Sequence, residues 1–442
     1  MGSTETVRLL LPELVWRDER FESGMAVELR DDGRIGRIVE ASALGPEGRQ
    51  ATRLSGRALL PGFSNAHSHA FQRGLRGHGE RYPQGAGSFW TWREAMYRLV
   101  DSLDASNAYR LSRLAFDEML GAGFTSVGEF HYLHHGPAGR DFLLDRAVLR
   151  AAADAGIRIV LLQTHYRTGG IGRPLGGGQA RFDTESVERY WESVDALRAV
   201  LDPRTQSIGA VAHSVRAVPR EEIVRLREEA RRRNMVFHMH VEEVRGEIED
   251  CVAAHGRRPM EMLLEDGVVD DRFTAVHCTH TDPTDMDGFV AAGGTVCLCP
   301  LTEGNLGDGV PDLPGMLRSR GRIAIGSDLN SHLDAFEELR WIEYVQRLVR
   351  MQRGVARNDD GRVAPTLLRV GTAHGAGALG LDAGAIRTGA LADLVSIDLG
   401  HPTLEGWTAE TLPECLVFGA GNAVIDGVWV GGRQVRGGLA SD

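Results

Sequence analysis

Three histidines and one aspartate of this chain have the types and spacing of metal ligands. His67 and His69 are separated by one residue, so both rings point to one side if the segment is extended. His240 and Asp328 follow later, each near the end of an apolar run. Three neutral imidazoles and a carboxylate suit zinc and similar divalent ions. The four residues therefore predict a site in which one metal ion activates water for hydrolysis.

The absence of lysine limits the number of metal ions that the site is expected to hold. All 50 basic residues are Arg and none is Lys, so a carbamylated lysine that bridges two ions is excluded, as is a Schiff-base lysine. We therefore expect one ion per chain, with Zn²⁺ preferred and Fe²⁺ as the alternative, because both accept nitrogen and oxygen donors. His238 competes with His240 as a ligand because the two share one strand face. We favour His240, which is nearer the strand's end, and expect His238 to be packed or to support a ligand.

Two further side chains are placed to move protons. Glu243 lies three residues beyond His240, and His277 ends the next apolar run. Their alternative roles are an acid at a helix N-terminus for Glu243 and a buried, hydrogen-bonded imidazole for His277. Either His277 or Asp328 would accept the first proton from the water. The cluster "HYLHH" (131–135) has the residue types for a metal, but no acid or cysteine accompanies it in the sequence.

The elements that must position these residues alternate between helical patterns and short apolar runs. Eight such runs end near residues 67, 129, 165, 213, 240, 277, 299 and 328. Apolar strands alternating with helices favour parallel pairing with both faces buried. Eight units predict a closed (β/α)₈ barrel, with a doubly wound open sheet as the alternative. In such a barrel the ends of the strands, and with them the candidate residues, share one mouth.

The two ends of the chain have a different pattern. Segments 27–39, 390–398 and 423–435 are short alternating strands broken by Asp-Gly or Gly-Gly turns. This pattern predicts one small β-sandwich domain built from both termini. The expected boundaries are residues 1–60 for its first part, 61–375 for the barrel and 376–442 for its second part.

Composition narrows the class of protein. The chain has 442 residues, 42% of them hydrophobic, which is enough for a full core. A net charge of −11 without a basic run argues against nucleic acid as a partner. Five cysteines suit a reducing compartment, and neither a run of 18 apolar residues nor a signal peptide is present. We therefore expect a cytoplasmic protein without a membrane partner.

At this point the chain resembles the amidohydrolase superfamily over nearly its whole length. The segments "LLPGFSNAHSHA", "HMHVEE", "AVHCTH" and "IGSDLN" are similar to the family's metal and proton-transfer motifs. The resemblance implies a barrel with a β-sandwich from the termini, a single-metal deaminase branch and a homodimer. It also implies that His67, His69, His240 and Asp328 bind the metal while Glu243 and His277 move protons.

Three further segments, "FQRGLRG" with "SFWTWREAMY", "VAHSVRAVP" and "CLCPLTEGNLGDG", are similar to those of family members that deiminate N-formimidoyl-L-glutamate. This resemblance implies that substrate contacts come from Gln72, Arg93, Tyr132, His213 and Arg216. Arg93 and Arg216 offer planar forks suited to a dicarboxylate, although either is a candidate for a surface arginine. The alternatives are a guanine, cytosine or adenosine-type deaminase, hydrolysis of a ring C–N bond as in imidazolonepropionate, and a barrel without catalysis.

Overall fold

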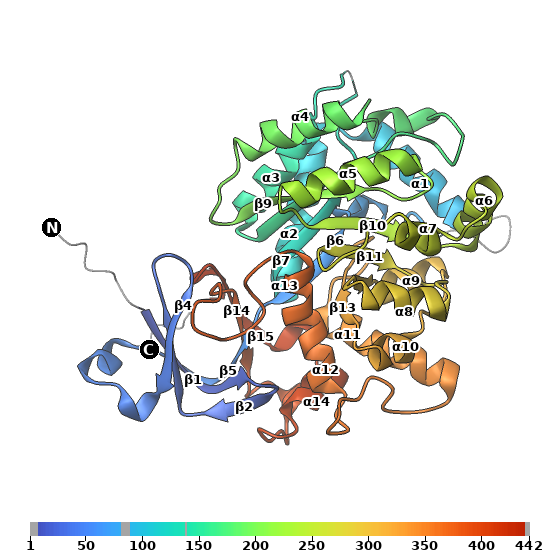
Figure 1. Cartoon of the computed structure of the whole chain (residues 1–442). Coiled ribbons are helices and arrows are strands. Elements are labelled where there is room, and N and C mark those ends of the chain that lie inside the picture. The colour runs from blue at the N-terminus through green and yellow to red at the C-terminus, as the bar shows by residue number, and fades with distance from the viewer. Residues whose placement is uncertain (1–7, 81–88, 138, 438–442) are drawn as a thin grey trace.

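The structure is a computed structural model that describes residues 8–80, 89–137 and 139–437. It contains a closed barrel of eight parallel strands beside a separate sheet (Figure 1). The barrel strands are β6 (Phe63–Ser68), β7 (Phe124–His131), β8 (Arg158–His165), β9 (Gln206–Ala212), β10 (Phe237–Val241), β11 (Phe273–His277), β12 (Thr295–Leu298) and β13 (Arg322–Ile325). Pairing of Ile325 with Asn65 joins the last strand to the first. The predicted eight-stranded barrel is therefore confirmed, and the open sheet is excluded.

The last α-helix in the chain packs on two other helices, whereas most of the others follow barrel strands and cover their outer side (Figure 1). The described residues contain fourteen α-helices. They are α1 (Phe89–Ser102), α2 (Ala105–Gly121), α3 (Leu143–Ala155), α4 (Val187–Arg198), α5 (Arg220–Arg232), α6 (Arg245–His255), α7 (Pro259–Glu265), α8 (Pro283–Ala291), α9 (Pro300–Leu306), α10 (Leu313–Arg318), α11 (Ala335–Arg350), α12 (Ala364–Arg369), α13 (Gly375–Ala378) and α14 (Leu412–Gly419). Local sequence explains the ends of α5, which begins after Pro219 and has Glu221 and Glu222 in its first turn. Arg231 and Arg232 complement the opposite end of its dipole.

The second sheet combines both ends of the chain, as predicted. Its order is β16-β15-β14-β5-β1-β3-β4, with β2 paired to β1. The strands are β1 (Arg8–Arg17), β2 (Arg20–Ser23), β3 (Met25–Leu29), β4 (Ile35–Glu40), β5 (Thr52–Pro61), β14 (Leu394–Asp398), β15 (Ile425–Val430) and β16 (Arg433–Arg436). The exact domain boundaries stay a prediction. Residues 1–7 and 438–442 of that prediction, and Ser88 of the quoted "SFWTWREAMY", lie outside the described residues.

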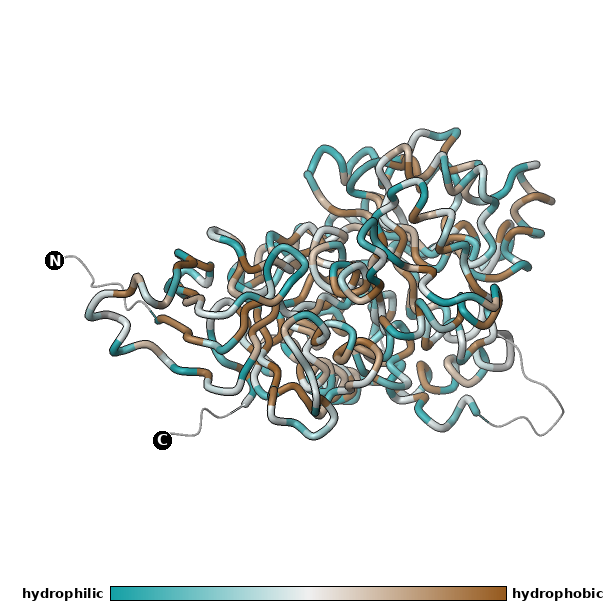
Figure 2. Tube along the Cα trace, turned by 90° about the horizontal axis from the view of Figure 1, so that it is seen from below, coloured by the Kyte–Doolittle hydropathy of each residue, from teal (hydrophilic) through white to brown (hydrophobic). Residues whose placement is uncertain are grey.

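A buried ion pair joins the barrel to this sheet. Arg158, the first residue of β8, donates from Nε and Nη2 to the Asp393 carboxylate just before β14, at 2.6 and 3.0 Å. Both side chains are almost fully buried. Figure 2 shows hydrophobic stretches inside both parts of the molecule and hydrophilic stretches on many outer loops. Within the described ranges, none of the helices is long and apolar enough to cross a membrane.

Candidate active site

The four predicted metal ligands meet at the carboxyl ends of the barrel strands. His67 lies on β6 with His69 just past its end, His240 lies on β10, and Asp328 follows β13. The Nε2 atoms of His67 and His240 are 3.2 Å apart, and Asp328 Oδ1 is 3.5 Å from His67 Nε2 and 3.3 Å from His69 Nε2. All four side chains are buried. Ligands about 2.0 to 2.1 Å from a tetrahedral ion lie roughly 3.3 to 3.4 Å from one another, so this spacing fits one divalent ion.

Hydrogen bonds to backbone carbonyls orient two of the rings. His69 Nδ1 lies 2.7 Å from the Phe130 carbonyl oxygen, and His240 Nδ1 lies 3.1 Å from that of His213. Each Nδ1 must carry the hydrogen, which leaves the Nε2 lone pair for a ligand. Burial lowers the pKa of His69 to about 3 and the pKa values of His67 and His240 well below the ordinary range. The rings are therefore neutral at pH 7, the form that binds a metal.

A left-handed backbone and a small polar network hold Asp328 in place. Its φ is 47°, a conformation that a non-glycine residue adopts only when its surroundings impose it. The Asp328 N–H donates to the His67 carbonyl, and the Asp328 carbonyl accepts from His69 N–H. Asn330 Nδ2 donates to Ser68 Oγ and to the Asp328 carbonyl, both at 3.1 Å. The loop after β13 is thus tied to the strand that carries the two histidines.

His277 is surrounded by the carboxylates of Glu243, Glu303 and Asp328. Its Nε2 is 3.7 Å from both Glu243 Oε1 and Asp328 Oδ2, and its Nδ1 is 3.4 Å from Glu303 Oε1. Burial opposes a charge on the ring, but Glu243, Glu303 and Asp328 together outweigh it and raise the pKa of His277 to about 10. A divalent cation beside Asp328 would oppose that protonation, because like charges repel. His277 is thus positioned to exchange a proton with a molecule bound beside both His277 and Glu243.

Arg216 connects Glu243 to a second buried acid. Its Nη2 donates to Glu243 Oε2 at 2.6 Å, and its Nε lies 3.4 Å from Glu247 Oε2. Burial raises the pKa of Glu247 to about 7, although Arg216 acts in the opposite direction. Burial also works against the charge of Arg216, yet Glu247 and Glu243 raise the pKa of the guanidinium. Arg216 therefore brings a fixed positive charge to the cavity wall.

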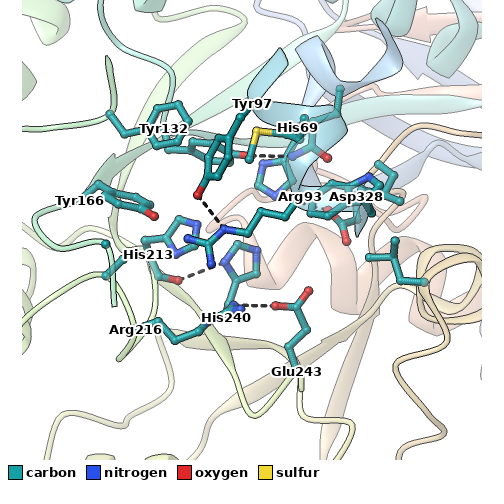
Figure 3. Close-up of a pocket in the computed structure, with 18 residues that line it drawn as sticks. His69, Arg93, Tyr97, Tyr132, Tyr166, His213, Arg216, His240, Glu243 and Asp328 are labelled. Carbon is teal, nitrogen blue, oxygen red and sulfur yellow. Dashed lines mark hydrogen bonds and ion pairs between the residues drawn. The ribbon is translucent and has the colours of Figure 1, made fainter. Parts of the chain in front are cut away.

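A cavity at the barrel mouth contains the remaining predicted residues. Its lining includes Gln72, Arg93, Tyr132, His213 and Arg216, together with His69, His240, Glu243 and Asp328. Figure 3 shows the Arg93 side chain extending into the middle of this cavity, where its Nε donates to Tyr97 Oη at 2.6 Å. Gln72 Nε2 donates to Tyr132 Oη at the same distance. The structure thus brings all five proposed substrate contacts to one space beside the histidines.

Two histidines without assigned roles lie apart from this space. His238 is buried on the same face of β10 as His240, and its Nε2 lies 2.9 Å from the Ala378 carbonyl oxygen, so it is a packed, hydrogen-bonded histidine as expected. The His332 side chain is 59% exposed and pairs with Glu337 at 2.9 Å.

Sequence reasoning missed Glu303, Glu247 and Tyr97. Each of them had a signal in the sequence that could have identified it. Glu303 and Tyr97 lie in the segments "CLCPLTEGNLGDG" and "SFWTWREAMY", and Glu247 is four residues from Glu243, the spacing that places two residues on the same side of a helix.

A parallel barrel with three imidazoles and a carboxylate at its mouth, beside a proton-carrying histidine and glutamate, defines the class of metal-dependent hydrolases. The chain belongs to the Amidohydrolase family, whose model matches residues 58–435. It is 39% identical to the formimidoylglutamate deiminase of Pseudomonas aeruginosa, over 98% of this chain and 94% of that one.

Solved structures of relatives have the same fold. A Brucella melitensis amidohydrolase superimposes with a TM-score of 0.88 at 31% identity, over 97% of this chain and 94% of that one. A Xanthomonas campestris adenosine deaminase with bound zinc has a TM-score of 0.80 at 24% identity, over 97% and 92% of the two chains.

Proposed function

We propose that this enzyme hydrolyses N-formimidoyl-L-glutamate to N-formyl-L-glutamate and ammonia. The observation that carries the proposal is that Arg93 and Arg216 line the same cavity as three of the four clustered metal-ligand candidates. These three are His69, His240 and Asp328, and the buried His67 contacts His240 and Asp328. Two guanidinium groups match a substrate with two carboxylates at one end. Its formimidoyl carbon, at the other end, needs an activated water. The similarity to a formimidoylglutamate deiminase supports this substrate.

In this proposal His67, His69, His240 and Asp328 hold one divalent ion, with zinc preferred because nitrogen and oxygen donors at tetrahedral spacing suit it. When bound, such an ion supplies a large lowering of the pKa of water, from 15.7 toward about 7. A homodimer and a cytoplasmic location stay predictions from the sequence, as does the identity of the metal.

The chain's own residues would carry the protons. A water oxygen adds to the formimidoyl carbon while Asp328 or His277 accepts the water's proton. Glu243 holds the cationic nitrogen of the formimidoyl group, so the addition gives a neutral adduct with one hydroxyl and one amino group. The proton taken from the water passes through Glu243 to this amino group, the hydroxyl gives its own proton to the residue that accepted the first one, the carbon–nitrogen bond breaks, and ammonia leaves. His277, once protonated, stabilises the negative charge that develops on the oxygen. The contacts of 3.7 Å from His277 Nε2 to Glu243 and Asp328 support these roles.

A nucleoside or nucleobase deaminase is the second candidate. Aromatic side chains suited to a flat ring line the cavity, namely Trp92, Tyr97, Tyr132, Tyr166 and Phe182. The two arginines argue against this candidate, because a neutral base offers no carboxylate to pair with them.

The test is ammonia release from formimidoylglutamate measured beside release from guanine, cytosine and S-adenosylhomocysteine. We expect turnover of formimidoylglutamate alone, and activity only on a base or nucleoside would reject the substrate. The variant Glu243→Gln should lower kcat by roughly 10² to 10⁴-fold, the usual contribution of a general acid or base. Its metal content should equal that of the unmodified enzyme, and retained activity would reject the role of Glu243.

A further inference from the structure

A second group of buried ligand-type side chains lies outside the cavity. His131 ends β7, His134 follows in the next loop, and Asp145 lies in the first turn of α3. Side chains alternate along β7, so Phe130 contacts the His67 and His240 rings inside the barrel while His131 faces Asp145 of α3. The acid that "HYLHH" lacks in the sequence is therefore brought to it by the fold. All three side chains are at most 1% exposed.

The hydrogen bonds of His134 require a positively charged group between its ring and Asp145. His134 Nε2 lies 2.7 Å from the Thr164 carbonyl oxygen, which can only accept, so Nε2 carries a hydrogen. His134 Nδ1 faces both Asp145 carboxylate oxygens, at 3.1 and 3.2 Å. A lone pair on Nδ1 would repel a carboxylate at this distance. Either a proton or a metal ion must therefore lie between them.

His131 distinguishes a metal ion from a proton. Its two ring nitrogens are both buried and have no hydrogen-bond partner among the described residues. Its Nε2 is 3.9 Å from Asp145 Oδ2, too far for a hydrogen bond. A proton on His134 would leave both nitrogens unsatisfied, which is unfavourable in a buried site. An ion bound to Asp145 would give the nearer of these nitrogens, Nε2, a partner at the same time.

Gln163 completes the surroundings of the carboxylate. Its Nε2 donates to Asp145 Oδ1 at 3.1 Å and to Ser193 Oγ at 3.0 Å. Its amide oxygen is also buried without a hydrogen-bond partner in the part of the chain that the structure describes. One donor atom from each of His131, His134 and Asp145 lies within 4.8 Å of the others, as in the cluster at the barrel mouth. Imidazole nitrogens with a carboxylate oxygen are donors that zinc accepts.

We propose that His131, His134 and Asp145 bind a second divalent metal ion of the zinc type, while the Gln163 amide nitrogen holds the Asp145 carboxylate in place. The site is structural, because its ligands are closed to solvent. It fixes the segment 131–135 against α3, and this segment carries Tyr132 into the cavity. It does not depend on the substrate proposed above, since neither Arg93 nor Arg216 takes part.

The experiment counts metal ions per chain by mass spectrometry after growth with zinc and extensive dialysis. We expect two ions in the unmodified protein, one in His131→Asn, and two in His238→Asn, a matched variant that removes another buried histidine. An unmodified protein with one ion, and His131→Asn with the same one ion, would overturn the site.

A second measurement uses only the unmodified protein, in case His131→Asn fails to fold. Anomalous diffraction at the zinc edge should give one peak at the barrel mouth and another between His131 and Asp145. A single peak, at His67 and Asp328, would overturn the second site. Ammonia release is not needed for either measurement, so failure of the proposed reaction and failure of this site are distinguishable.

Discussion

Replacing Arg216 by methionine tests whether its guanidinium recognises a substrate carboxylate in addition to holding Glu243, to which its Nη2 donates at 2.6 Å. Methionine keeps much of the side-chain length but removes the guanidinium that faces the cavity. A hydrogen bond to a charged group contributes about 1.5 to 3 kcal/mol, and each 1.4 kcal/mol is about tenfold in affinity. We therefore expect kcat/KM for formimidoylglutamate to fall about 10- to 150-fold. Loss of Arg216 also leaves Glu247 without its cation, and this carboxyl, whose pKa burial already raises to about 7, then takes up a proton.

The assay compares two substrates. Ammonia release is measured with formimidoylglutamate and with formamidine, which has the reacting group but no carboxylates. The loss should be larger with formimidoylglutamate than with formamidine, because formamidine reports only the part of the loss that passes through Glu243. For formimidoylglutamate, KM should be raised more than kcat is lowered. Arg167→Met is the matched control, because Arg167 pairs with Asp183 at 2.7 Å and does not line the cavity. An equal loss on both substrates, or no loss on either, would refute the role of Arg216 in carboxylate recognition.

Three other changes test the scaffold and the support of the site. Arg158→Met leaves the buried Asp393 without its guanidinium, so the free energy of unfolding in urea should fall by about 3 to 5 kcal/mol, partly restored by adding Asp393→Asn. Burial raises the pKa of Glu129 from 4.5 to about 8. Between these pH values the folded state keeps a proton on Glu129 that the unfolded chain releases, so the free energy of unfolding falls as the pH rises through this range. Glu129→Gln should consequently gain Tm relative to the unmodified protein as pH increases, whereas parallel pH profiles would contradict the shift. Glu303→Gln weakens the hydrogen-bond acceptor that orients the His277 ring at Nδ1, so kcat should fall about 10- to 100-fold. The number of metal ions per chain should not change, and an unaltered kcat would contradict the role of Glu303 in orienting His277.

The barrel and the main cluster were predictable because each depends on short-range sequence patterns. An apolar run that ends in a polar residue indicates a barrel strand. The polar residue indicates the carboxyl end of that strand, where the candidate site lies. Closure of eight such strands brings His67, His240 and Asp328 together without any further information. The choice of His240 over His238 follows from the same reasoning, and the structure places His238 against the Ala378 carbonyl oxygen instead.

Residues contributed by helices could not be located in this way. Glu303 reaches His277 only because α9 begins directly at the barrel mouth, and Asp145 reaches His134 only because α3 packs against β8. Neither contact leaves a periodic signal, since each depends on how a loop directs the helix after it. The position of Arg93 on α1, away from any barrel strand, was accessible only through the family resemblance.

The split sheet has a consequence for how the chain is made. β5 pairs with β1 on one side and with β14 on the other. About 330 residues separate the end of β5 from β14, and ribosomes add roughly 5 to 20 residues per second. The nascent chain must therefore keep one edge of β5 unpaired for about 15 to 70 seconds of translation, while the barrel emerges. We expect premature stops before Leu394 to leave that edge exposed permanently and to produce aggregating fragments rather than a smaller folded enzyme.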